Sequence, residues 1–370
     1  MLLKMCAPTL FGLEGMTANE LKHLGFKNVA AENGRVRFEG DELGLAKANI
    51  CSRFSERILI ELAHFKAITF DELFEGTKAA KWETFIPKTG SFPVKGYSLN
   101  SALHSVPDCQ RIIKKAISAR LGMKYSLNWL PESGEEYQVQ FSIMKDEVYL
   151  YLDTSGVGLH KRGYRPAQVQ APLRETLAAA LVDMAGYRGR EDFCDPFCGS
   201  GTIAIEAALS AKRRAPGINR AFSAENWHAV DHRVWNEARE EAKAREFNRE
   251  YRIFASDIDP EAIEISRKNA ARAGVADIID FSVADAAWFQ RRTESGIIVT
   301  NPPYGERMLD KGEAHKLVHG FGLAMKKLEG WSVTIITSDE ELEHHYGRRA
   351  DKVRKLYNGM IKCGAYYFKG

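Results

Sequence analysis

The sequence predicts an α/β protein whose C-terminal half is a mainly parallel sheet, covered by helices on both faces and completed by an antiparallel hairpin. Two observations predict this half. Short apolar strands alternate with helical segments from about residue 170, and Asn358-Gly359 lies between two β-rich runs. Such alternation favours a parallel sheet, and Asn-Gly between β-rich runs favours a hairpin. A third observation is that the first half mixes strands, helices and glycines without this alternation, which predicts smaller α+β domains.

Composition sets the broad class. A chain of 370 residues favours two or three domains, and 45% hydrophobic with 27% charged residues is ordinary for a soluble globular protein. No apolar run approaches a membrane span, and the N-terminus lacks the layout of a signal peptide. The six cysteines are scattered, and the pair in CDPFC (194–198) is interpreted as core packing. We therefore expect a cytoplasmic protein with reduced thiols and no metal site.

Charge is clustered although its sum is small. The formal net charge is +3, but basic residues gather at 160–165, 212–214, 291–292 and 348–349. Each cluster on its own is more often a solvated face than a contact surface. Several clusters in one nearly neutral protein raise the odds of a phosphate-bearing partner.

The first half is expected to hold two domains, with boundaries near residues 65 and 165. The predicted division is therefore 1–65, 66–165 and 166–370. In the second of these, strands at 91–101 and 137–153 are expected around a helix at Asp108–Leu121. The alternating run 137–153 carries Lys145-Asp146 near its middle and is interpreted as a hairpin.

The elements of the second half follow in order. We expect helices at 171–186, 202–211, 234–246, 260–273 and 313–328, and strands at 192–195, 252–256, 279–283, 296–300 and 332–337. The run KLYNGMIKCGAYYF (355–368) is expected to form the closing hairpin.

A glycine turn follows the first of these strands, in FCDPFCGSGTIAIEAA (193–208). Gly199 and Gly201 would let the backbone approach a ligand closely before a helix begins. No lysine follows the glycines, so a phosphate-gripping P-loop is excluded. The same sequence also fits a dinucleotide-binding turn. On its own it therefore does not distinguish that class of protein from others that bind a ligand at a glycine turn.

Polar side chains follow the next strands. Asp257 ends the second strand and could accept hydrogen bonds from both hydroxyls of a ribose. It lies 56 residues after Gly201, whereas NAD-binding folds place such an acid about 20 residues on. Asp285 follows the third strand and could accept from an exocyclic amine. Carboxyl ends of parallel strands line one crevice, although either aspartate could instead be only a helix N-cap.

The fourth strand stops at Asn301-Pro302-Pro303-Tyr304. Two successive prolines cannot continue a strand, because neither has a backbone N–H and each fixes φ. The bland interpretation is that this segment merely ends the strand. The functional interpretation is that the strand end presents an amide, a rigid carbonyl and an aromatic ring to a ligand.

Asp195, Gly199, Gly201, Asp257, Asp285 and NPPY together resemble the class I S-adenosylmethionine-dependent methyltransferases, and NPPY is typical of the branch that methylates exocyclic amines of nucleobases. The resemblance implies a seven-stranded Rossmann-like domain and S-adenosylmethionine as cofactor. It implies a cofactor site formed by Asp195, Phe197, Gly199, Gly201, Thr202, Asp257, Ile258, Asp285 and Asn301. It also implies a catalytic set of Asn301, Pro302, Pro303 and Tyr304: two oxygens accept the amine hydrogens and the tyrosine stacks on the base.

A longer resemblance narrows the substrate. YRPAQVQAPLRETLAAAL (164–181), NPPYGERM (301–308) and VYLYLDTSGVGLHKRGYR (148–165) resemble the bacterial THUMP-containing RNA guanine-N2 methyltransferases, which are often labelled N6-adenine-specific DNA methylases. This implies a ferredoxin-like domain, a THUMP domain and a methyltransferase domain. It implies methylation of a guanine N2 amine in 23S ribosomal RNA. It also implies structured RNA as partner, with Lys161, Arg162, Tyr164 and Arg165 as RNA contacts.

Some members of that family fuse two methyltransferase domains, whereas this sequence shows one, so a single modification activity is expected. A DNA adenine-N6 methyltransferase would share Asn301–Tyr304 but would need a DNA-recognition domain, and no zinc finger or clear helix-turn-helix pattern is present. The residues also leave open a non-catalytic RNA-binding or ribosome-assembly protein and an NAD-dependent enzyme. Oligomeric state is not indicated by the sequence.

Overall fold

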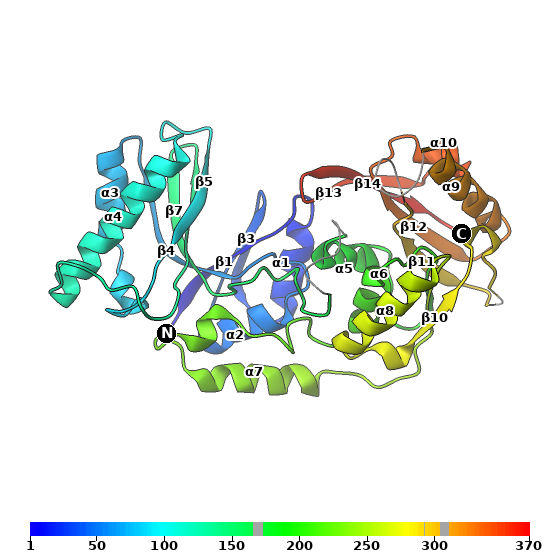
Figure 1. Ribbon diagram of the computed structural model, residues 1–370, viewed down its shortest axis with the longest axis horizontal. Coiled ribbons are helices and arrows are strands. Elements are labelled where there is room, and N and C mark those ends of the chain that lie inside the picture. The colour runs from blue at the N-terminus through cyan, green and yellow to red at the C-terminus, as the bar shows by residue number, and fades with distance from the viewer. Residues whose placement is uncertain (166–172, 292, 304–310) are drawn as a thin grey trace. The chain divides into compact units, whose positions relative to one another are not determined.

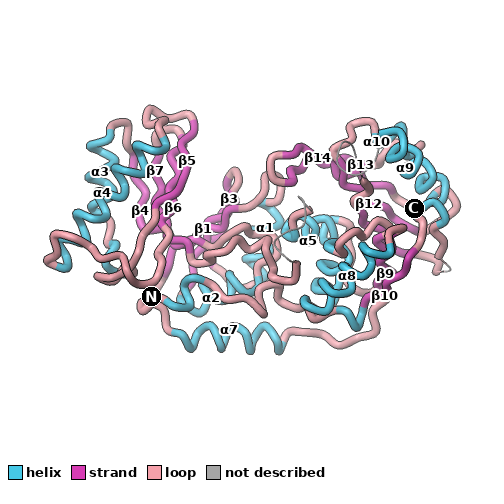
Figure 2. Tube along the Cα trace, viewed as in Figure 1, coloured by secondary structure: helices cyan, strands magenta, loops and turns pink. Residues whose placement is uncertain are grey.

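The structure is a computed structural model that describes residues 1–165, 173–291, 293–303 and 311–370. Contacts divide the chain into two compact units (Figures 1 and 2). The first unit comprises Met1–Thr9, Thr17–Leu159 and Arg220–Glu241, and the second comprises Leu10–Met16, His160–Asn219 and Ala242–Gly370. Across the described residues each unit contains one seven-stranded sheet. In the same residues no helix is both long enough and apolar enough to cross a membrane.

The first unit is built on a mainly antiparallel sheet of order β2-β3-β1-β4-β7-β6-β5, in which only β5 and β6 pair in parallel. Its strands are β1 (Leu3–Pro8), β2 (Lys27–Glu32), β3 (Arg35–Gly40), β4 (Leu59–Lys66), β5 (Val94–Leu99), β6 (Val139–Met144) and β7 (Glu147–Asp153). Its helices are most of α1 (Glu14–His23), α2 (Glu42–Cys51), α3 (Phe70–Ala79), the 3-10 turn η1 (Trp82–Thr84) and α4 (Val106–Tyr125). Because β4 pairs with β1 on one side and β7 on the other, the predicted domains 1–65 and 66–165 share one sheet.

Local sequence explains the β6–β7 hairpin. Val148, Leu150 and Leu152 alternate along β7, and all three are fully buried. Lys145 and Asp146 join the strands with φ values of +52° and +66°. Two positive φ values in a two-residue loop define a type I′ turn, which matches the twist of the flanking strands. The predicted hairpin is confirmed.

One segment lies in the first unit although it follows the glycine turn in sequence. Residues 220–241 include the 3-10 turn η2 (Ser223–Asn226) and most of α7 (His232–Ala244). Trp227 is fully buried there, stacks on Tyr137 with ring centroids 4.9 Å apart, and donates Nε1–H to the Glu136 carbonyl at 3.1 Å. Contacts therefore group residues 220–241 of the predicted range 166–370 with the first unit.

The second unit is built on a sheet of order β10-β9-β8-β11-β12-β14-β13. Five strands are parallel, and β14 pairs antiparallel with β12 and β13. The strands are β8 (Asp192–Asp195), β9 (Ile253–Asp257), β10 (Ile279–Val283), β11 (Gly296–Thr300), β12 (Trp331–Thr337), β13 (Lys352–Asn358) and β14 (Ile361–Phe368). The chain builds outward from β8 to β10 and then returns to β11 on the other side of β8. This reversal is the topological switch point at which open α/β sheets bind ligands.

Helices cover both faces of this sheet (Figure 1). On one face α6 (Thr202–Ala211) packs between α5 (Glu175–Met184) and α8 (Pro260–Ala273), and on the other α9 (Lys311–Met325) packs against α10 (Leu342–Tyr346). Two 3-10 turns, η3 (Ala276–Ile278) and η4 (Ala286–Trp288), flank β10. The core on the α9 side includes Phe321, Ile298 and Ile335, each no more than 1% exposed. The predicted α/β class with a parallel sheet and a closing hairpin is confirmed.

The closing hairpin differs from the prediction by one residue. Asn358 still pairs with Ile361, so the two-residue loop is Gly359-Met360 rather than Asn358-Gly359. Only Gly359 of these two has a left-handed φ, +65°, which fits a type II′ turn with glycine first. Asn358 is held in the strand because its Oδ1 accepts from the Arg174 N–H at 3.2 Å.

Candidate active site

The glycine turn after β8 is held in place by hydrogen bonds from side chains of α8. Gly199 and Gly201 have φ values of +49° and +81°, a region that favours glycine. The Ser266 hydroxyl donates to the Gly199 carbonyl at 2.6 Å, and the Asn269 amide donates to the Ser200 carbonyl at 3.0 Å. A Cβ at Gly201 would lie 3.1 Å from the Ser266 Cβ, whereas at Gly199 it would meet open space. The turn therefore leaves room for a ligand on one side only.

The carboxylate of Asp257, at the end of β9, closes the same turn. It accepts from the Gly199 N–H at 2.9 Å and from the Asp259 N–H at 3.1 Å. The N-cap of α8 is Asp259, whose side chain accepts from the Glu261 N–H at 2.8 Å. The interpretation of Asp257 as a helix cap is therefore wrong. Ile258 beside it is 60% exposed, an apolar surface at the strand end.

Asp285 behaves differently. It is the N-cap of η4, and its Oδ1 accepts from the Ala287 N–H at 2.8 Å. The capping interpretation therefore holds for this residue. Capping uses one carboxylate oxygen, so the other oxygen can still accept a hydrogen bond from the amine of a ligand. Asp285 and Asp257 follow adjacent strands, because β10 and β9 pair in register up to Val283 and Asp257.

Asp195 ends β8 and is 1% exposed. Burial raises the pKa of its carboxyl to about 7, against the opposing hydrogen bonds from Thr300 and the Phe197 N–H. Thr300 Oγ1 donates to Oδ1 at 2.7 Å, and Oδ2 is a buried atom without a hydrogen-bond partner among the described residues. Asp195 therefore ties β8 to the end of β11 and keeps one acceptor unused.

Asn301 follows Thr300 directly, on the other side of the switch point. Its Oδ1 is buried and has no hydrogen-bond partner in the part of the chain that the structure describes. Pro302 is buried and Pro303 is half-buried. Tyr304 lies outside the described residues. A buried unpaired carbonyl oxygen costs about 1–3 kcal/mol, so Asn301 Oδ1 is a candidate acceptor for a hydrogen bond from a ligand.

The structure brings together most of the predicted cofactor residues. Gly199 and Asp257 are joined by a hydrogen bond, and Thr300 links Asp195 to the strand end that carries Asn301. Phe197 packs edge-on against Phe321, with centroids 5.3 Å apart. Sequence reasoning missed the supporting residues on α8 described above, although their i,i+3 spacing on a predicted helix is a usable signal.

The predicted RNA contacts at the start of the second unit are corrected in part. Arg162 and Tyr164 are 5% and 3% exposed, and both reach Glu206 on α6, at 3.5 Å and 3.1 Å. Burial raises the pKa of the Tyr164 phenol. These two side chains are buried inside the unit and are not available to contact RNA. Lys161 is exposed.

Arg165 also contacts residues of its own unit. It pairs with Glu175 at 2.7 Å and donates to Thr202 Oγ1 at 3.1 Å. Thr202 and Glu206 are one helical turn apart on α6, so the segment 162–165 lies along that helix. Arg165 therefore orients a predicted cofactor residue instead of presenting its charge to RNA.

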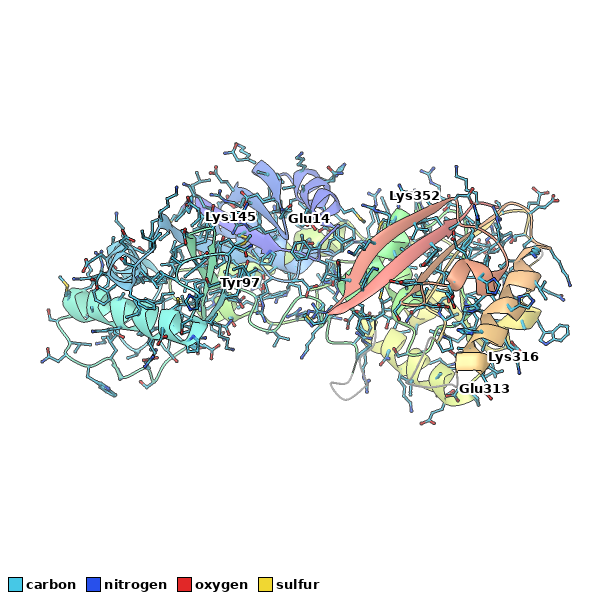
Figure 3. The ribbon with its side chains drawn as sticks, turned by 90° about the horizontal axis from the view of Figure 1, so that it is seen from above. Glu14, Tyr97, Lys145, Glu313, Lys316 and Lys352 are labelled. Atoms are coloured by element: carbon cyan, nitrogen blue, oxygen red, sulfur yellow. The ribbon has the colours of Figure 1, made fainter. Side chains whose placement is uncertain are left out.

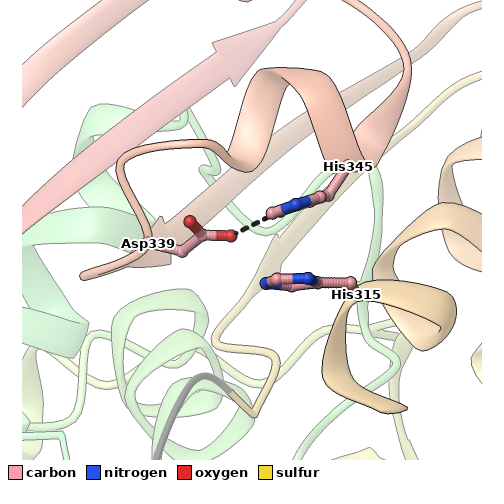
Figure 4. Close-up of side chains that lie close together, drawn as sticks. All are labelled: His315, Asp339 and His345. Atoms are coloured by element: carbon pink, nitrogen blue, oxygen red, sulfur yellow. Dashed lines mark hydrogen bonds and ion pairs between the residues drawn. The ribbon is translucent and has the colours of Figure 1, made fainter. Parts of the chain in front are cut away.

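A histidine cluster that the sequence does not indicate lies near the end of β12 (Figure 4). His345 Nδ1 lies 2.8 Å from Asp339 Oδ2, and the His315 and His345 rings stack with centroids 3.5 Å apart. Their ligand atoms and an Asp339 oxygen lie within 4.8 Å of one another, which makes them the one such cluster with metal-ligand side chains in the described ranges. Parallel stacked rings do not converge on one ion, so the geometry here is that of a hydrogen-bonded pair and a stack.

The strand order, with its switch point and antiparallel closing hairpin, is that of a class I methyltransferase. Comparison with known proteins agrees. Residues 162–366 match the family described as "RMKL-like, methyltransferase domain", residues 4–59 match "RlmL ferredoxin-like domain", and residues 67–153 match "THUMP domain". The chain belongs to this RlmL-like methyltransferase family.

Two curated relatives are similar over almost the whole chain. "Putative RNA methyltransferase YpsC" of Bacillus subtilis (strain 168) is 47% identical over 98% of this chain and 95% of its own length. "Ribosomal RNA large subunit methyltransferase K/L" of Psychromonas ingrahamii is 36% identical over 96% of this chain. This chain spans 49% of the length of that second protein.

Two solved structures share the fold throughout. One is described as a predicted N6-adenine-specific DNA methylase from Listeria monocytogenes; it is 45% identical with a TM-score of 0.95, and the match covers 100% of this chain and 97% of that one. The other is SMU.472, described as a putative methyltransferase complexed with SAH; it is 38% identical with a TM-score of 0.93, and the match covers 100% and 98%.

Proposed function

We propose that this protein transfers a methyl group from S-adenosylmethionine to the exocyclic N2 amine of a guanine in RNA, with 23S ribosomal RNA as the substrate. The observation that carries the proposal is the buried, unpartnered Oδ1 of Asn301, at the switch point, among the described residues. A ring nitrogen or carbon of a base does not offer two hydrogens to a pair of acceptors, whereas an exocyclic amine does. The second acceptor would be the carbonyl of Pro302, held by Pro303.

The side chains at the strand ends suit S-adenosylmethionine. Asp257 would accept from the ribose hydroxyls, Ile258 would pack on the adenine ring, and Asp285 would accept from the adenine amine. The turn from Phe197 to Gly201 would lie along the methionine part, on the side where Gly199 has open space. SMU.472, described as complexed with SAH, shares the fold at 38% identity and supports this assignment. When bound, the cofactor supplies an activated methyl group on sulfur.

The residues of this chain would then act by positioning. Asn301 and the Pro302 carbonyl would orient the amine so that its lone pair faces the methyl carbon. Thr300, fixed by its bond to Asp195 at 2.7 Å, would hold Asn301 in place. Tyr304 would stack on a base turned out of its helix or loop. Alignment of reacting atoms supplies a large share of catalysis in reactions of this kind.

RNA as the substrate class is supported by the THUMP match and by the names of both curated relatives. A second candidate, adenine-N6 methylation of DNA, is favoured by the description of the Listeria protein as a predicted N6-adenine-specific DNA methylase. The acceptor pair accommodates either amine, because both carry two hydrogens. Guanine N2 is preferred on the long motif resemblance that runs through residues 148–181 and 301–308.

The test combines transfer and binding. Wild-type protein, Asn301→Ala and a control, Asn219→Ala, would be incubated with methyl-labelled S-adenosylmethionine and large-subunit RNA. Asn219 is an exposed asparagine in the same unit. We expect Asn301→Ala to lose at least about 10²-fold in turnover, the usual effect of removing one transition-state hydrogen bond. Cofactor affinity by calorimetric titration should be unchanged. Full turnover in Asn301→Ala would contradict the proposal.

A further inference from the structure

A basic cluster lies at the amino edge of the second sheet, at the opposite edge from the active site. It combines residues 212–214, which follow α6, with residues 243–252, which run from the end of α7 to the start of β9. The proposed function uses none of these residues. Because β9 crosses the sheet in five residues, the cluster and the carboxyl edge are about 16 Å apart.

An aromatic ring at the centre of this cluster is held against the end of α6. The Phe247 N–H donates to the Lys212 carbonyl at 2.8 Å, and the Phe247 carbonyl accepts from the Tyr251 hydroxyl at 2.8 Å. The ring is 37% exposed. Two guanidinium groups lie over it, with Cζ of Arg213 at 4.3 Å and Cζ of Arg249 at 5.3 Å from its centre. Stacking uses the face of a guanidinium group, so the N–H donors in its plane stay available to an anion.

Arg213 has a backbone conformation that an arginine does not favour. Its φ is +53°, in the left-handed region that glycine adopts freely and that strains an L side chain. The left-handed residues that end α5, α8 and α10 are Gly186, Gly274 and Gly347, with φ values of +82°, +73° and +77°. Glycine is the usual residue at this point of a helix. Ending α6 therefore does not explain why position 213 carries an arginine.

The charge of the cluster stays positive after its own ion pairs are counted. The two segments contain seven basic residues and two acids. Three of the basic residues pair with acids: Lys212 with Asp277, Arg214 with Glu246 and Arg252 with Asp192. The remaining acid, Glu250, is outnumbered by Arg213, Lys243 and Arg249. Neither Arg213 nor Arg249 forms an ion pair with any residue that the structure describes, and both are exposed. Exposed positive charge without a carboxylate partner favours a phosphate-bearing ligand.

We propose that Arg213, Phe247 and Arg249 form a second contact site for the RNA substrate, remote from the site of methyl transfer. The inference rests on the proposed function and adds a binding site to it. The two guanidinium groups donate to phosphate oxygens of the RNA backbone, and the ring holds them in place. Contacts to phosphates fix the position and orientation of a nucleic acid without reading its bases. The site therefore anchors a part of the RNA about 16 Å from the target guanine.

A purely structural explanation competes with this proposal. Cations near the end of a helix stabilise it through the helix dipole, and an arginine on an aromatic ring adds a favourable contact. This explanation predicts that loss of the Arg213 side chain destabilises the fold and leaves RNA affinity unchanged. The proposal predicts the reverse for Arg213→Gly, because glycine relieves the backbone strain while it removes the phosphate contact.

The experiment compares two double variants of the full-length protein. Arg213→Gly with Arg249→Ala removes both guanidinium groups. The control, Lys326→Ala with Lys352→Ala, removes two exposed lysines at the same edge of the sheet, after α9 and at the start of β13, where Figure 3 labels Lys352. Binding of one large-subunit RNA fragment is measured between about 0.05 and 0.3 M salt, a range over which phosphate contacts change affinity strongly. Methyl transfer, S-adenosylmethionine affinity and urea unfolding are measured in parallel.

We expect the arginine variant to lower the slope of log K against log salt by about 1.4 to 1.8, because each lost phosphate contact accounts for about 0.7 to 0.9. Its KM for RNA should rise at least about fivefold, whereas kcat and cofactor affinity should stay at the wild-type values. Replacing Arg249→Ala by Arg249→Lys in this variant keeps one charge and should recover about half of the lost slope. The control should change the slope much less.

Equal slopes for the two double variants would overturn the contact site while leaving the methyl-transfer proposal intact. A lower urea midpoint for Arg213→Gly together with wild-type RNA affinity would also overturn it and favour the structural explanation. Absence of any methyl transfer to RNA by the wild-type protein would instead overturn the proposed function, and the salt dependence of RNA binding would still decide the contact site.

Discussion

Two asparagines, one in each unit, differ in how their buried polar atoms are bonded. Asn49 in the first unit donates to the Leu45 carbonyl and to Thr154 Oγ1, both at 3.0 Å, and accepts from Ser155 Oγ at 2.6 Å. Asn301 in the second unit keeps a buried Oδ1 with no partner among the described residues. Bonded polar groups inside a fold stabilise it, whereas an unbonded one costs stability.

The same contrast extends to the sheets. The first sheet is mainly antiparallel and spans both parts of the N-terminal half. The second has a run of parallel strands whose carboxyl ends present Asp195, Asp257 and Asn301 at one edge. A parallel sheet with a topological switch therefore gathers acceptors at one crevice. Antiparallel pairing places successive strand ends at opposite edges and does not.

The largest expected difference separates the two asparagines. Asn49→Ala should destabilise the first unit by about 2–4 kcal/mol, because three hydrogen bonds are lost and Thr154 and Ser155 lose partners. Asn301→Ala should leave the unfolding free energy unchanged or slightly raised, because it removes an acceptor that has no partner in the described part of the chain. Urea unfolding followed by far-UV circular dichroism measures both. Comparable destabilisation by the two substitutions would contradict the proposed difference between Asn49 and Asn301.

A second prediction tests Asp257 against its neighbour Asp259. Asp257→Ala should weaken S-adenosylmethionine binding by about 1–3 kcal/mol, the range for a charge-assisted hydrogen bond. Asp259→Ala removes the N-cap of α8 and should cost about 0.5–2 kcal/mol of stability instead. Calorimetric titration gives the first quantity and denaturant unfolding the second. Wild-type affinity in Asp257→Ala would exclude Asp257 from the cofactor site.

A further effect should appear in the pH dependence of stability. Burial raises the pKa of Asp195 to about 7 in the folded protein, while the unfolded value is about 3.9. Between these two pKa values the Asp195 carboxyl is protonated in the folded state and ionised in the unfolded state. The contribution of this proton to stability is fully present below about pH 4 and is lost as pH rises through 7. Between about pH 5 and 8 we expect a loss of about 2–3 kcal/mol in the wild type that is absent in Asp195→Asn.

The check is the difference in unfolding free energy between the two pH values, measured for both proteins. Subtracting one from the other cancels the contribution of the remaining titrating groups. The same pH dependence in Asp195→Asn as in the wild type would show that Asp195 is not the group responsible.

Much of the second unit could be predicted from sequence because local signals and buried strands agree there. The helix Pro260–Ala273 has Asp259 as N-cap, proline at its first position and Gly274 after its end, and the structure places it at those residues. Strand ends are marked by polar residues directly after apolar runs, which is how Asp195, Asp257 and Asn301 can be located.

Other features depend on tertiary packing and leave no local signal. Nothing in residues 220–241 indicates that Trp227 stacks on Tyr137, so the sequence places this segment in the range 166–370, whereas contacts group it with the first unit. The sequence of a basic run such as His160–Arg165 does not show whether its side chains face solvent or the interior. In the structure Arg162 and Tyr164 contact the buried Glu206. The histidine cluster forms only because the fold brings the end of β12 beside α9.

The central claim is that this protein methylates the N2 amine of a guanine in RNA, and the identity of the methylated nucleoside tests it most directly. Large-subunit RNA would be methylated by the wild-type protein with labelled S-adenosylmethionine, digested to nucleosides and separated by liquid chromatography with mass detection. We predict label in N2-methylguanosine. Label in N6-methyladenosine would contradict the guanine assignment and favour adenine as the target base.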